Sequence, residues 1–429
     1  MQELQLNQLY AAKDAGTYTK LYFDMPAGIE RIEIEYDYPR FVEETLSEGS
    51  SRREANIIDL GIYNEKGCLY GWSGSNRRSV FISSIAASPG YRHGIFNQGQ
   101  WAIALGLYKI ESNVKVQVTI RLYPRERKLF LGDLHLHTVN SDGSCTTAEA
   151  VQFCEKMGLD FIALTDHNNM KQNSEIGNPE KLSVIPGVEF TNYRGHANFF
   201  FCDPGIRFED NFLSGGFDET AALFRRAKAA GALISVNHPF NRDCPWEFGF
   251  DNLPFDMIEV WNGYMCEFNL EAVAFWHELL RQGKKISAVG GSDAHAHNFG
   301  IPCTMIYAES PSPVQLLASL AAGRCCIAHE PGGPRLDMDI AGTGPGDTVP
   351  YTSGLKGRAI VQKARKGDVV KIINSEGTAS IFSSPFNGTY TPAFPVEDRC
   401  FYRIELYRSL LDRPVLCGLS NPVYIGSVK

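Results

Sequence analysis

The middle of the chain, about residues 129–334, alternates short apolar segments with segments of helical periodicity. The segment LFLGDLHLH is followed by a helix that opens with TTAEA, and the alternation continues as far as the helix VQLLASLAAGR. A strand–helix alternation of this kind favours a parallel sheet, either open or closed into a barrel. We therefore predict an α/β domain over residues 129–334.

The two flanking regions alternate apolar and polar residues with a period of two. In IEIEYDY, Ile32, Ile34 and Tyr36 share one face, and VKVQVTIRL, DVVKIIN and FYRIELY are strand candidates of the same kind. This period is typical of antiparallel strands with one buried face. We expect a β-sandwich over residues 1–128 and a second, smaller one over 335–429. The predicted fold class is thus multidomain, α/β in the middle and all-β at both ends.

The bulk composition excludes several classes of protein. A net charge of −8 and a pI near 5.7 argue against a broad nucleic-acid surface. No apolar run approaches the roughly 18 residues needed to cross a bilayer, and MQELQLNQLY does not resemble a signal peptide. The 11 cysteines are scattered without a CxxC pair, which fits reduced thiols. We expect a cytoplasmic protein that binds neither a membrane nor a nucleic-acid polymer.

Histidine and acidic residues stand at the ends of the apolar segments of the middle region. They are His135, His137, Asp166, His167, Glu189, His196, His238, Asp293 and His295. Parallel strands of a barrel end at one face, so these residues are expected to converge there. Imidazole and carboxylate are ligands for Zn²⁺, Mn²⁺ or Fe²⁺, and burying them together without a cation would be unfavourable. The pattern predicts a metal site.

Each member of this set, taken alone, is weak evidence for a metal site. A lone histidine at the end of a strand is more often a satisfied polar residue than a ligand, and this holds for His196 and His238 taken separately. His277 lies at helical spacing inside EAVAFWHELL, and His297 and His329 follow strands. We expect these last three histidines to lie outside the site.

The motifs DLHLHTVNSDG, ALTDHN, PGVEFT, RGH, VNHP and GSDAH make the middle region resemble the PHP (polymerase and histidinol phosphatase) superfamily. The order of the domains makes the full chain similar to the CehA/McbA-type metallohydrolases within it. The resemblance implies a distorted (β/α)₇ barrel that holds two or three divalent metal ions (Zn, Mn or Fe), flanked here by two β-sandwich domains.

The resemblance also implies nine metal ligands in three groups, of which two share Glu189 as a bridge. One ion would be bound by His135, His137, Glu189 and Asp293, a second by Glu189, His196 and His238, and a third by Asp142, His167 and His295. Some members of the family have a histidine where this chain has Asp142.

Charge counting suggests a substrate class. Three divalent ions carry +6, and Asp142, Glu189 and Asp293 return −3, so the site would be near +3; with two ions it would be near +2. Such a surplus suits a phosphate monoester dianion, with a metal-bridging hydroxide as the nucleophile. The predicted function is a metal-dependent phosphoesterase acting on small-molecule or nucleotide phosphate monoesters.

Three further residues have predicted roles. Asp166 would orient ligands or shuttle a proton, Arg194 would clamp phosphate oxygens, and Asn262 would line the substrate pocket. An ordinary surface arginine is the alternative for Arg194. Two other functions stay open: hydrolysis of carbamates or carboxyl esters, as the CehA/McbA resemblance implies, and a non-catalytic metal-stabilised protein. In either case the β-sandwich domains are candidates for carbohydrate or protein contacts.

Overall fold

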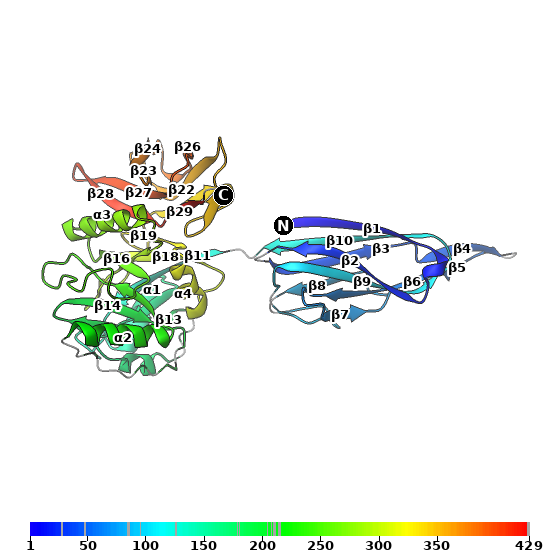
Figure 1. The fold of residues 1–429 in the computed structure, drawn as a ribbon, viewed down its shortest axis with the longest axis horizontal. Coiled ribbons are helices and arrows are strands. Elements are labelled where there is room, and N and C mark those ends of the chain that lie inside the picture. The colour runs from blue at the N-terminus through cyan, green and yellow to red at the C-terminus, as the bar shows by residue number, and fades with distance from the viewer. Residues whose placement is uncertain are drawn as a thin grey trace. The chain divides into compact units, whose positions relative to one another are not determined.

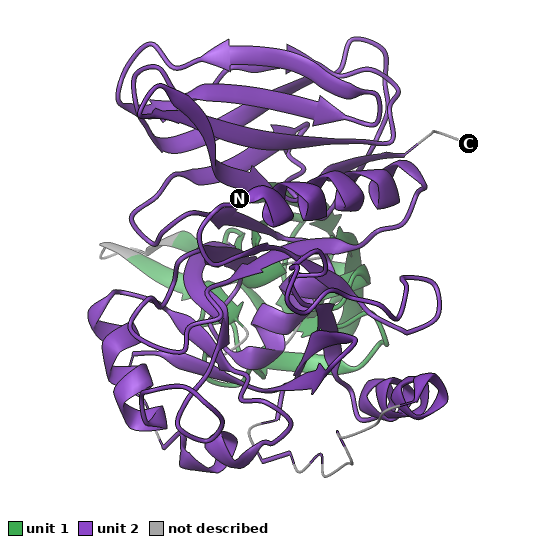
Figure 2. Ribbon diagram, turned by 90° about the vertical axis from the view of Figure 1, so that its left-hand side faces the viewer, with its two compact units in different colours: residues 1–126 green, residues 127–429 purple. Residues whose placement is uncertain are grey.

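The computed structural model consists of two compact units, Met1–Glu126 and Arg127–Lys429, shown in Figures 1 and 2. The residues that the structure describes are 1–26, 29–46, 49–83, 86–94, 96–124, 127–177, 179, 181–203, 205–206, 208, 212 and 216–426. Strands on both sides of residue 334 belong to the second unit. The division into three domains therefore stays a prediction.

The first unit contains two four-stranded antiparallel sheets. One has the order β1 (Gln2–Tyr10), β10 (Val114–Pro124), β3 (Ile29–Asp37), β8 (Ser79–Ser83). The other has the order β2 (Thr17–Met25), β9 (Gly99–Ile110), β6 (Asn56–Tyr63), β7 (Leu69–Ser73). The helix η1 (Ala12–Asp14) and the hairpin of β4 (Phe41–Leu46) and β5 (Gly49–Glu54) complete the unit. Alternate residues of both sheets form one apolar core, as the period of two predicts.

The second unit is built on a sheet of fifteen strands (Figure 1). Its path begins with β17 (Ser287–Gly291), β16 (Met257–Asn262), β15 (Leu233–Val236), β14 (Gly195–Phe200), β13 (Ser183–Asn192), β12 (Phe161–Leu164) and β11 (Lys128–Leu136). It continues through β18 (Cys303–Ala308), β19 (Cys325–Ala328), β28 (Arg413–Ser420), β27 (Phe401–Leu410), β23 (Val369–Asn374) and β24 (Gly377–Ser383). β29 (Val423–Gly426) and β21 (Thr348–Pro350) join it at β27.

The helices in the described part of the second unit connect strands between β11 and β19. They are α1 (Thr147–Lys156), η2 (Lys171–Glu175), α2 (Phe217–Ala229), α3 (Glu267–Arg281) and α4 (Pro313–Ala321). α1 begins at a capping box, in which Thr146 and Glu149 bond each other's backbone N–H groups. Within the described part of the chain, none of the helices has the length and apolar character needed to span a membrane.

The strands from β11 to β17 curve back on themselves. An isolated parallel bridge joins Leu136, at the end of β11, to Ala294, just after β17. The two segments approach closely at Gly291, where a Cβ atom would lie 2.4 Å from the Cβ of His135. Because only glycine permits this approach, β17 can bring its carboxyl end beside the histidines of β11.

The direction of β14 corrects the expectation of an entirely parallel sheet. β11–β13 pair in parallel, as do β15–β17, but β14 is antiparallel to both of its neighbours. The reason is the two-residue turn Tyr193–Arg194, which is too short for a parallel crossover connection. His196 therefore opens its strand, and pairs with Thr191 at the edge where the neighbouring strands end.

The C-terminal strands share a core with the first half of this unit. β20 (Arg335–Ile340), β22 (Lys356–Ala364), β25 (Gly388–Tyr390) and β26 (Ala393–Pro395) form a small sheet of their own. One apolar cluster joins Leu136 and Ile162 to Ile372 and Leu406. The hydrogen-bonded pairing of β19 with β28 further ties the two parts together.

Candidate metal centre

The structure brings all nine predicted ligands into one network of contacts. Each of them has a nitrogen or oxygen atom within 4.0 Å of another member. They come from the ends of β11, β13 and β14 and from the segments that follow β11, β12, β15 and β17. Convergence from so many elements is what a strand-end site requires.

Glu189 lies at the centre of this network and is completely buried. Five imidazole nitrogens surround its carboxylate: His135 Nε2 at 3.2 Å, His137 Nε2 at 3.6 Å, His167 Nδ1 at 2.7 Å, His196 Nδ1 at 3.3 Å and His238 Nε2 at 3.7 Å. Both carboxylate oxygens take part in these contacts, as the predicted bridging role requires.

Asp293 faces the same imidazoles from the segment after β17. Its Oδ1 atom lies 3.0 Å from His137 Nε2 and 3.4 Å from His135 Nε2. The backbone is left-handed at two of the ligands, with φ of 49° at Asp293 and 27° at His238. This conformation is unfavourable for residues other than glycine, and such strain concentrates at functional sites.

The third group lies closer to solvent than the other two. His167 Nε2 and His295 Nε2 lie 3.5 Å and 3.2 Å from Asp142 Oδ1. The Asp142 side chain is 57% exposed and that of His295 40% exposed, whereas His135, His137 and Glu189 are buried. The centre is therefore open on the side of this group.

The donor atoms fit divalent metal ions. His137 Nδ1 is buried but forms no hydrogen bond, which is costly unless another group binds it. His135 Nε2 faces carboxylate oxygens of Glu189 and Asp293. Three groups have donor atoms within 4.8 Å of one another: His135, His137 and Asp293; His137, Asp142, His167 and His295; and His196, His238 and Cys244. The first and second resemble the predicted groups, whereas Cys244 was not foreseen because its spacing fits no thiolate motif.

Comparison with protein families finds a PHP domain in this part of the chain. Residues 133–286 match the model of the PHP domain. This PHP segment contains seven of the nine predicted ligands, while Asp293 and His295 follow it. No curated protein matches the chain.

One similar solved structure is a two-domain protein from Bacteroides vulgatus that contains a predicted PHP-like metal-dependent phosphoesterase. It is 16% identical to this chain, with a TM-score of 0.43, and the match covers 68% of this chain and 95% of that one. A Bifidobacterium adolescentis protein described as a metal-dependent phosphoesterase is 18% identical (TM-score 0.26; 39% and 88% covered). An amidohydrolase from Chromobacterium violaceum is 15% identical (TM-score 0.30; 39% and 89% covered). The PHP match and the ligand groups together support a metal-dependent hydrolase.

The surroundings of His135 and His238 raise the pKa of both imidazoles in the metal-free protein. Burial would lower the pKa of His135, but Asp293, Glu259 and Glu189 outweigh it and hold that pKa well above its usual value. The pKa of His238 is likewise raised against the effect of burial. Burial would raise the pKa of Glu189, but the histidines around it hold that pKa well below its usual value.

We expect metal binding to release protons. Divalent ions bind neutral imidazole, and the raised pKa values of His135 and His238 leave both protonated near neutral pH in the metal-free protein. The apparent metal affinity should therefore rise with pH until these raised pKa values are passed. Titration calorimetry of the metal-free protein with Zn²⁺ or Mn²⁺, in two buffers of different ionisation enthalpy, measures the released protons. A binding enthalpy independent of the buffer would contradict this expectation.

Glu259 supports the site and was missed in the sequence. This buried residue of β16 places Oε1 3.0 Å from His135 Nδ1, while Oε2 accepts hydrogen bonds from the His238 backbone N–H and the Asn262 amide. A carboxylate that accepts from the far nitrogen of a ligating histidine fixes its tautomer and orientation. The signal in the sequence was a single acidic residue inside the apolar run MIEVW.

Glu259→Gln is expected to weaken metal binding about 10- to 100-fold, the usual effect of losing such a partner. The glutamine keeps the shape of the side chain but removes the charge that orients His135. Metal affinity is measured by competition with a chelating dye, and Glu278→Gln, an exposed change on α3, is the matched control. Equal affinities of the two variants would exclude this role.

Asp133 and Asn237 were also missed. Asp133 is buried and accepts hydrogen bonds from the backbone N–H groups of His135, Ser292 and Gly300. It thereby fastens the segment that carries Asp293 to β11. Asn237 donates its amide N–H to Glu189 Oε1 at 2.8 Å. Neither residue stands out in the sequence, because its role depends on partners distant along the chain.

The three additional predicted residues differ in their surroundings. The buried Asp166 carboxylate accepts hydrogen bonds from Thr138 and Ser141, so it holds the turn that leads to Asp142. Asn262 donates to Glu259 at 3.0 Å and to Asp293 at 3.4 Å, which places it beside the ligands. Arg194 lies exposed in the turn between β13 and β14. Their catalytic and substrate-binding roles stay predictions.

The three histidines expected to lie outside the site have surroundings of their own. His277 packs near Phe401 and Arg403, His297 against Phe153, and His329 beside Glu330. None of these contacts involves a member of the nine-residue network.

Proposed function

We propose that the chain is a metal-dependent phosphoesterase that hydrolyses phosphate monoesters of small molecules. The supporting observation is the buried Glu189 carboxylate within 3.7 Å of five imidazoles, with Asp293 facing the same side chains. Two or three Zn²⁺, Mn²⁺ or Fe²⁺ ions, when bound, would supply an activated water as nucleophile and positive charge for the phosphoryl oxygens.

The charge of the site supports an anionic substrate. Glu259, whose oxygen lies 3.0 Å from His135, adds a fourth negative charge to those of the three predicted ligand carboxylates. With three divalent ions the formal charge of the site is then +2, rather than the +3 counted from the ligands alone. With two ions, Glu189, Asp293 and Glu259 leave +1. A phosphate monoester dianion would be attracted in either case.

The proposed roles of the site residues differ with their burial. His135, His137 and Glu189 are buried and held by packing, so they fix the positions of the ions. The exposed side chains of Asp142 and His295 lie where a substrate enters. Asn262 is proposed to orient Asp293 and contact the substrate, and Asp166 to hold the Asp142 turn. Arg194 is the proposed phosphate clamp.

We also propose a domain arrangement, a cellular compartment and classes of partner for this chain. We propose a seven-stranded barrel over residues 129–334, between β-sandwich domains at 1–128 and 335–429 in the CehA/McbA arrangement. The return of β17 to β11 supports the barrel. The shared core of the two sheets in the first unit supports the first sandwich. The 11 free cysteines support a reducing compartment such as the cytoplasm. The proposed partners are small molecules and, through the flanking domains, carbohydrate or protein.

A second candidate is a carboxyl-ester or carbamate hydrolase. Within the described residues, no arginine or lysine is hydrogen-bonded or ion-paired to any of the nine predicted ligands. A site without an ordered cation at its ligands is less specialised for phosphate, and the same activated water can attack a carbonyl carbon. This observation favours the carboxyl-ester or carbamate alternative.

A paired assay on metal-reconstituted protein separates the two. 4-Nitrophenyl phosphate, 4-nitrophenyl acetate and a 4-nitrophenyl carbamate share one leaving group, so their kcat/KM values compare attack at phosphorus and at carbon. His135→Ala gives the background, and exhaustive chelation should abolish the rate until metal is restored. Phosphate preferred by about two or more orders of magnitude supports the proposal. Preference for acetate or carbamate would overturn it in favour of the second candidate.

A further inference from the structure

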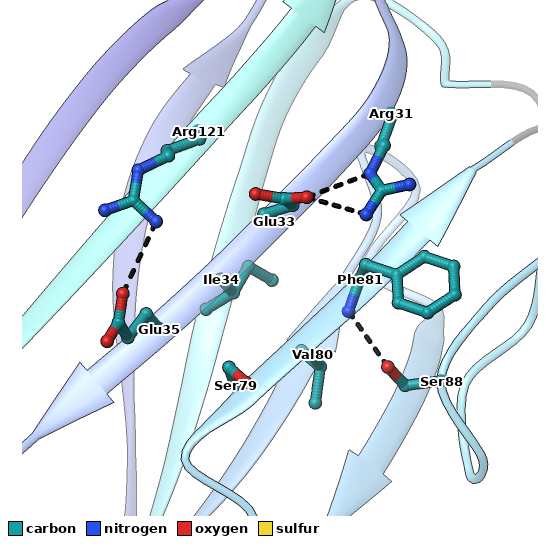
Figure 3. A pocket seen from close by; sticks show the side chains of 9 residues that line it. All are labelled: Arg31, Glu33, Ile34, Glu35, Ser79, Val80, Phe81, Ser88 and Arg121. Atoms are coloured by element: carbon teal, nitrogen blue, oxygen red, sulfur yellow. Dashed lines mark hydrogen bonds and ion pairs between the residues drawn. The ribbon is translucent and has the colours of Figure 1, made fainter.

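The two sheets of the first unit carry different side chains on their outer faces. On the β1–β10–β3–β8 sheet these residues are charged and neutralise one another: Arg31 pairs with Glu33, and Arg121 with Glu35 (Figure 3). This is the usual composition of a solvated sheet face. The outer face of the β2–β9–β6–β7 sheet is different.

Small residues line the centre of that second face. In β9, the run WAIALGLY alternates large residues of the core with Ala102, Ala104 and Gly106 on the opposite face. β6 places Gly61 directly beside Ala104 in the ladder. Ala102, Ala104, Gly106 and Gly61 therefore form a low floor, and the neighbouring β6 residues Asp59 and Tyr63 lie on the same face at its two ends.

Large side chains of the flanking strands border this floor, and the ring of Trp72 lies over Gly61 and Gly106. β2 contributes Tyr18, Lys20 and Tyr22, whose ladder partners are the three small residues of β9. β7 contributes Trp72, which is paired with Gly61. We call this groove the aromatic trough; it is formed by Tyr18, Lys20, Tyr22, Tyr63 and Trp72 over Ala104, and its volume is about 690 Å³.

Two aromatic side chains of the trough are exposed, and Tyr63 and Trp72 are half-buried. Tyr18 is 79% and Tyr22 57% exposed. Tyr18 packs edge-on against Trp72, with ring centroids 5.7 Å apart. A Cβ atom at Gly61 or Gly106 would lie 2.3 Å or 2.9 Å from the Trp72 ring, so the ring needs glycine beneath it. Clustered exposed apolar surface of this kind marks a binding site.

We propose that the aromatic trough binds a neutral oligosaccharide. Among the described residues that line it there is no carboxylate, and their one ammonium group, on Lys20, lies 3.9 Å from the centre of the Tyr63 ring. Such a lining does not favour a strongly charged ligand. Aromatic faces pack against the apolar C–H faces of sugar rings, and tyrosine hydroxyls both donate and accept hydrogen bonds, as sugar hydroxyls do. A proline-rich peptide, which offers only acceptors, matches them less well.

The shape favours a chain of sugars over a single small molecule. A second, smaller cavity of about 110 Å³ shares Tyr18 with the trough and is also lined by Asp59 and Tyr108. From Ala102 to Tyr108, β9 rises about 20 Å. Binding at this face goes beyond the proposed hydrolase site, and its test does not depend on turnover.

The test is calorimetric titration of the full chain with four neutral hexasaccharides: cellohexaose, xylohexaose, maltohexaose and mannohexaose. A proline decapeptide is titrated in parallel. We expect at least one hexasaccharide to bind with a millimolar or lower Kd, and the peptide not to bind. The absence of binding by all four at about 10 mM would overturn the proposal, and so would binding of the peptide alone.

Two variants locate the binding. Tyr22→Ala removes one wall, and Ala104→Leu fills the floor while keeping every aromatic side chain; each should weaken binding about tenfold or more. Tyr264→Ala, an exposed tyrosine of the second unit, is the matched control and should leave the Kd unchanged. Circular dichroism verifies that the variants are folded. Unchanged binding in both trough variants would place the sugar elsewhere and reject the trough.

Discussion

Glu189→Gln is expected to reduce kcat/KM for the preferred substrate by about three orders of magnitude or more, the scale on which enzymes lose rate when an essential group is removed. The substitution preserves volume but removes the negative charge that faces five imidazoles. An amide cannot bridge two cations as a carboxylate does. The loss should therefore appear in metal content as well as in rate.

Metal analysis and kinetics on the same preparation distinguish the causes. Glu271→Gln, an exposed change on α3, is the control and should keep full metal content and rate. Far-ultraviolet circular dichroism should show the strand-rich spectrum in both variants. A Glu189→Gln protein with normal metal content and normal turnover would remove the bridging carboxylate from the proposal.

Asp133→Ala is expected to lower the free energy of unfolding by about 3 kcal/mol or more. The buried carboxylate accepts from the backbone N–H groups of His135, Ser292 and Gly300. Without it these donors lose their partner in a buried place, and each unsatisfied group costs about 1–3 kcal/mol. Denaturant unfolding of the metal-free protein measures the change without a contribution from metal binding.

Two further variants separate this effect from a general one. Asp133→Asn keeps one acceptor oxygen and should fall between the wild type and the alanine variant. Asp243→Ala, at an exposed position, should change stability by less than about 0.5 kcal/mol. If Asp133→Ala were as stable as Asp243→Ala, the anchoring of the Asp293 segment would have to come from other contacts.

The sequence predicted the convergence of the ligands because their placement follows a general rule. His135, His167 and Asp293 end strands or follow them directly, and strand ends in such a sheet meet. Burial of alternate residues in the first unit followed equally from its period of two. The direction of β14 was not predicted, because it depends on the length of one turn rather than on any periodicity.

Residues that act through distant partners could not be predicted. Glu259 reads as an ordinary strand residue until His135, 124 positions away, is seen beside it. The aromatic trough could not be predicted for the same reason. WAIALGLY indicates a strand with small residues on one face, but only strand pairing brings Tyr18 and Trp72 to opposite sides of it.

The pairing of β19 with β28 has a consequence for synthesis on the ribosome. β19 ends at Ala328, whereas its partner begins at Arg413, so more than eighty residues must emerge before that edge is covered. Until then the nascent chain exposes an unpaired strand edge and half of an apolar core, both of which favour aggregation. The region that carries the histidines thus completes its folding only when the last strands of the chain arrive.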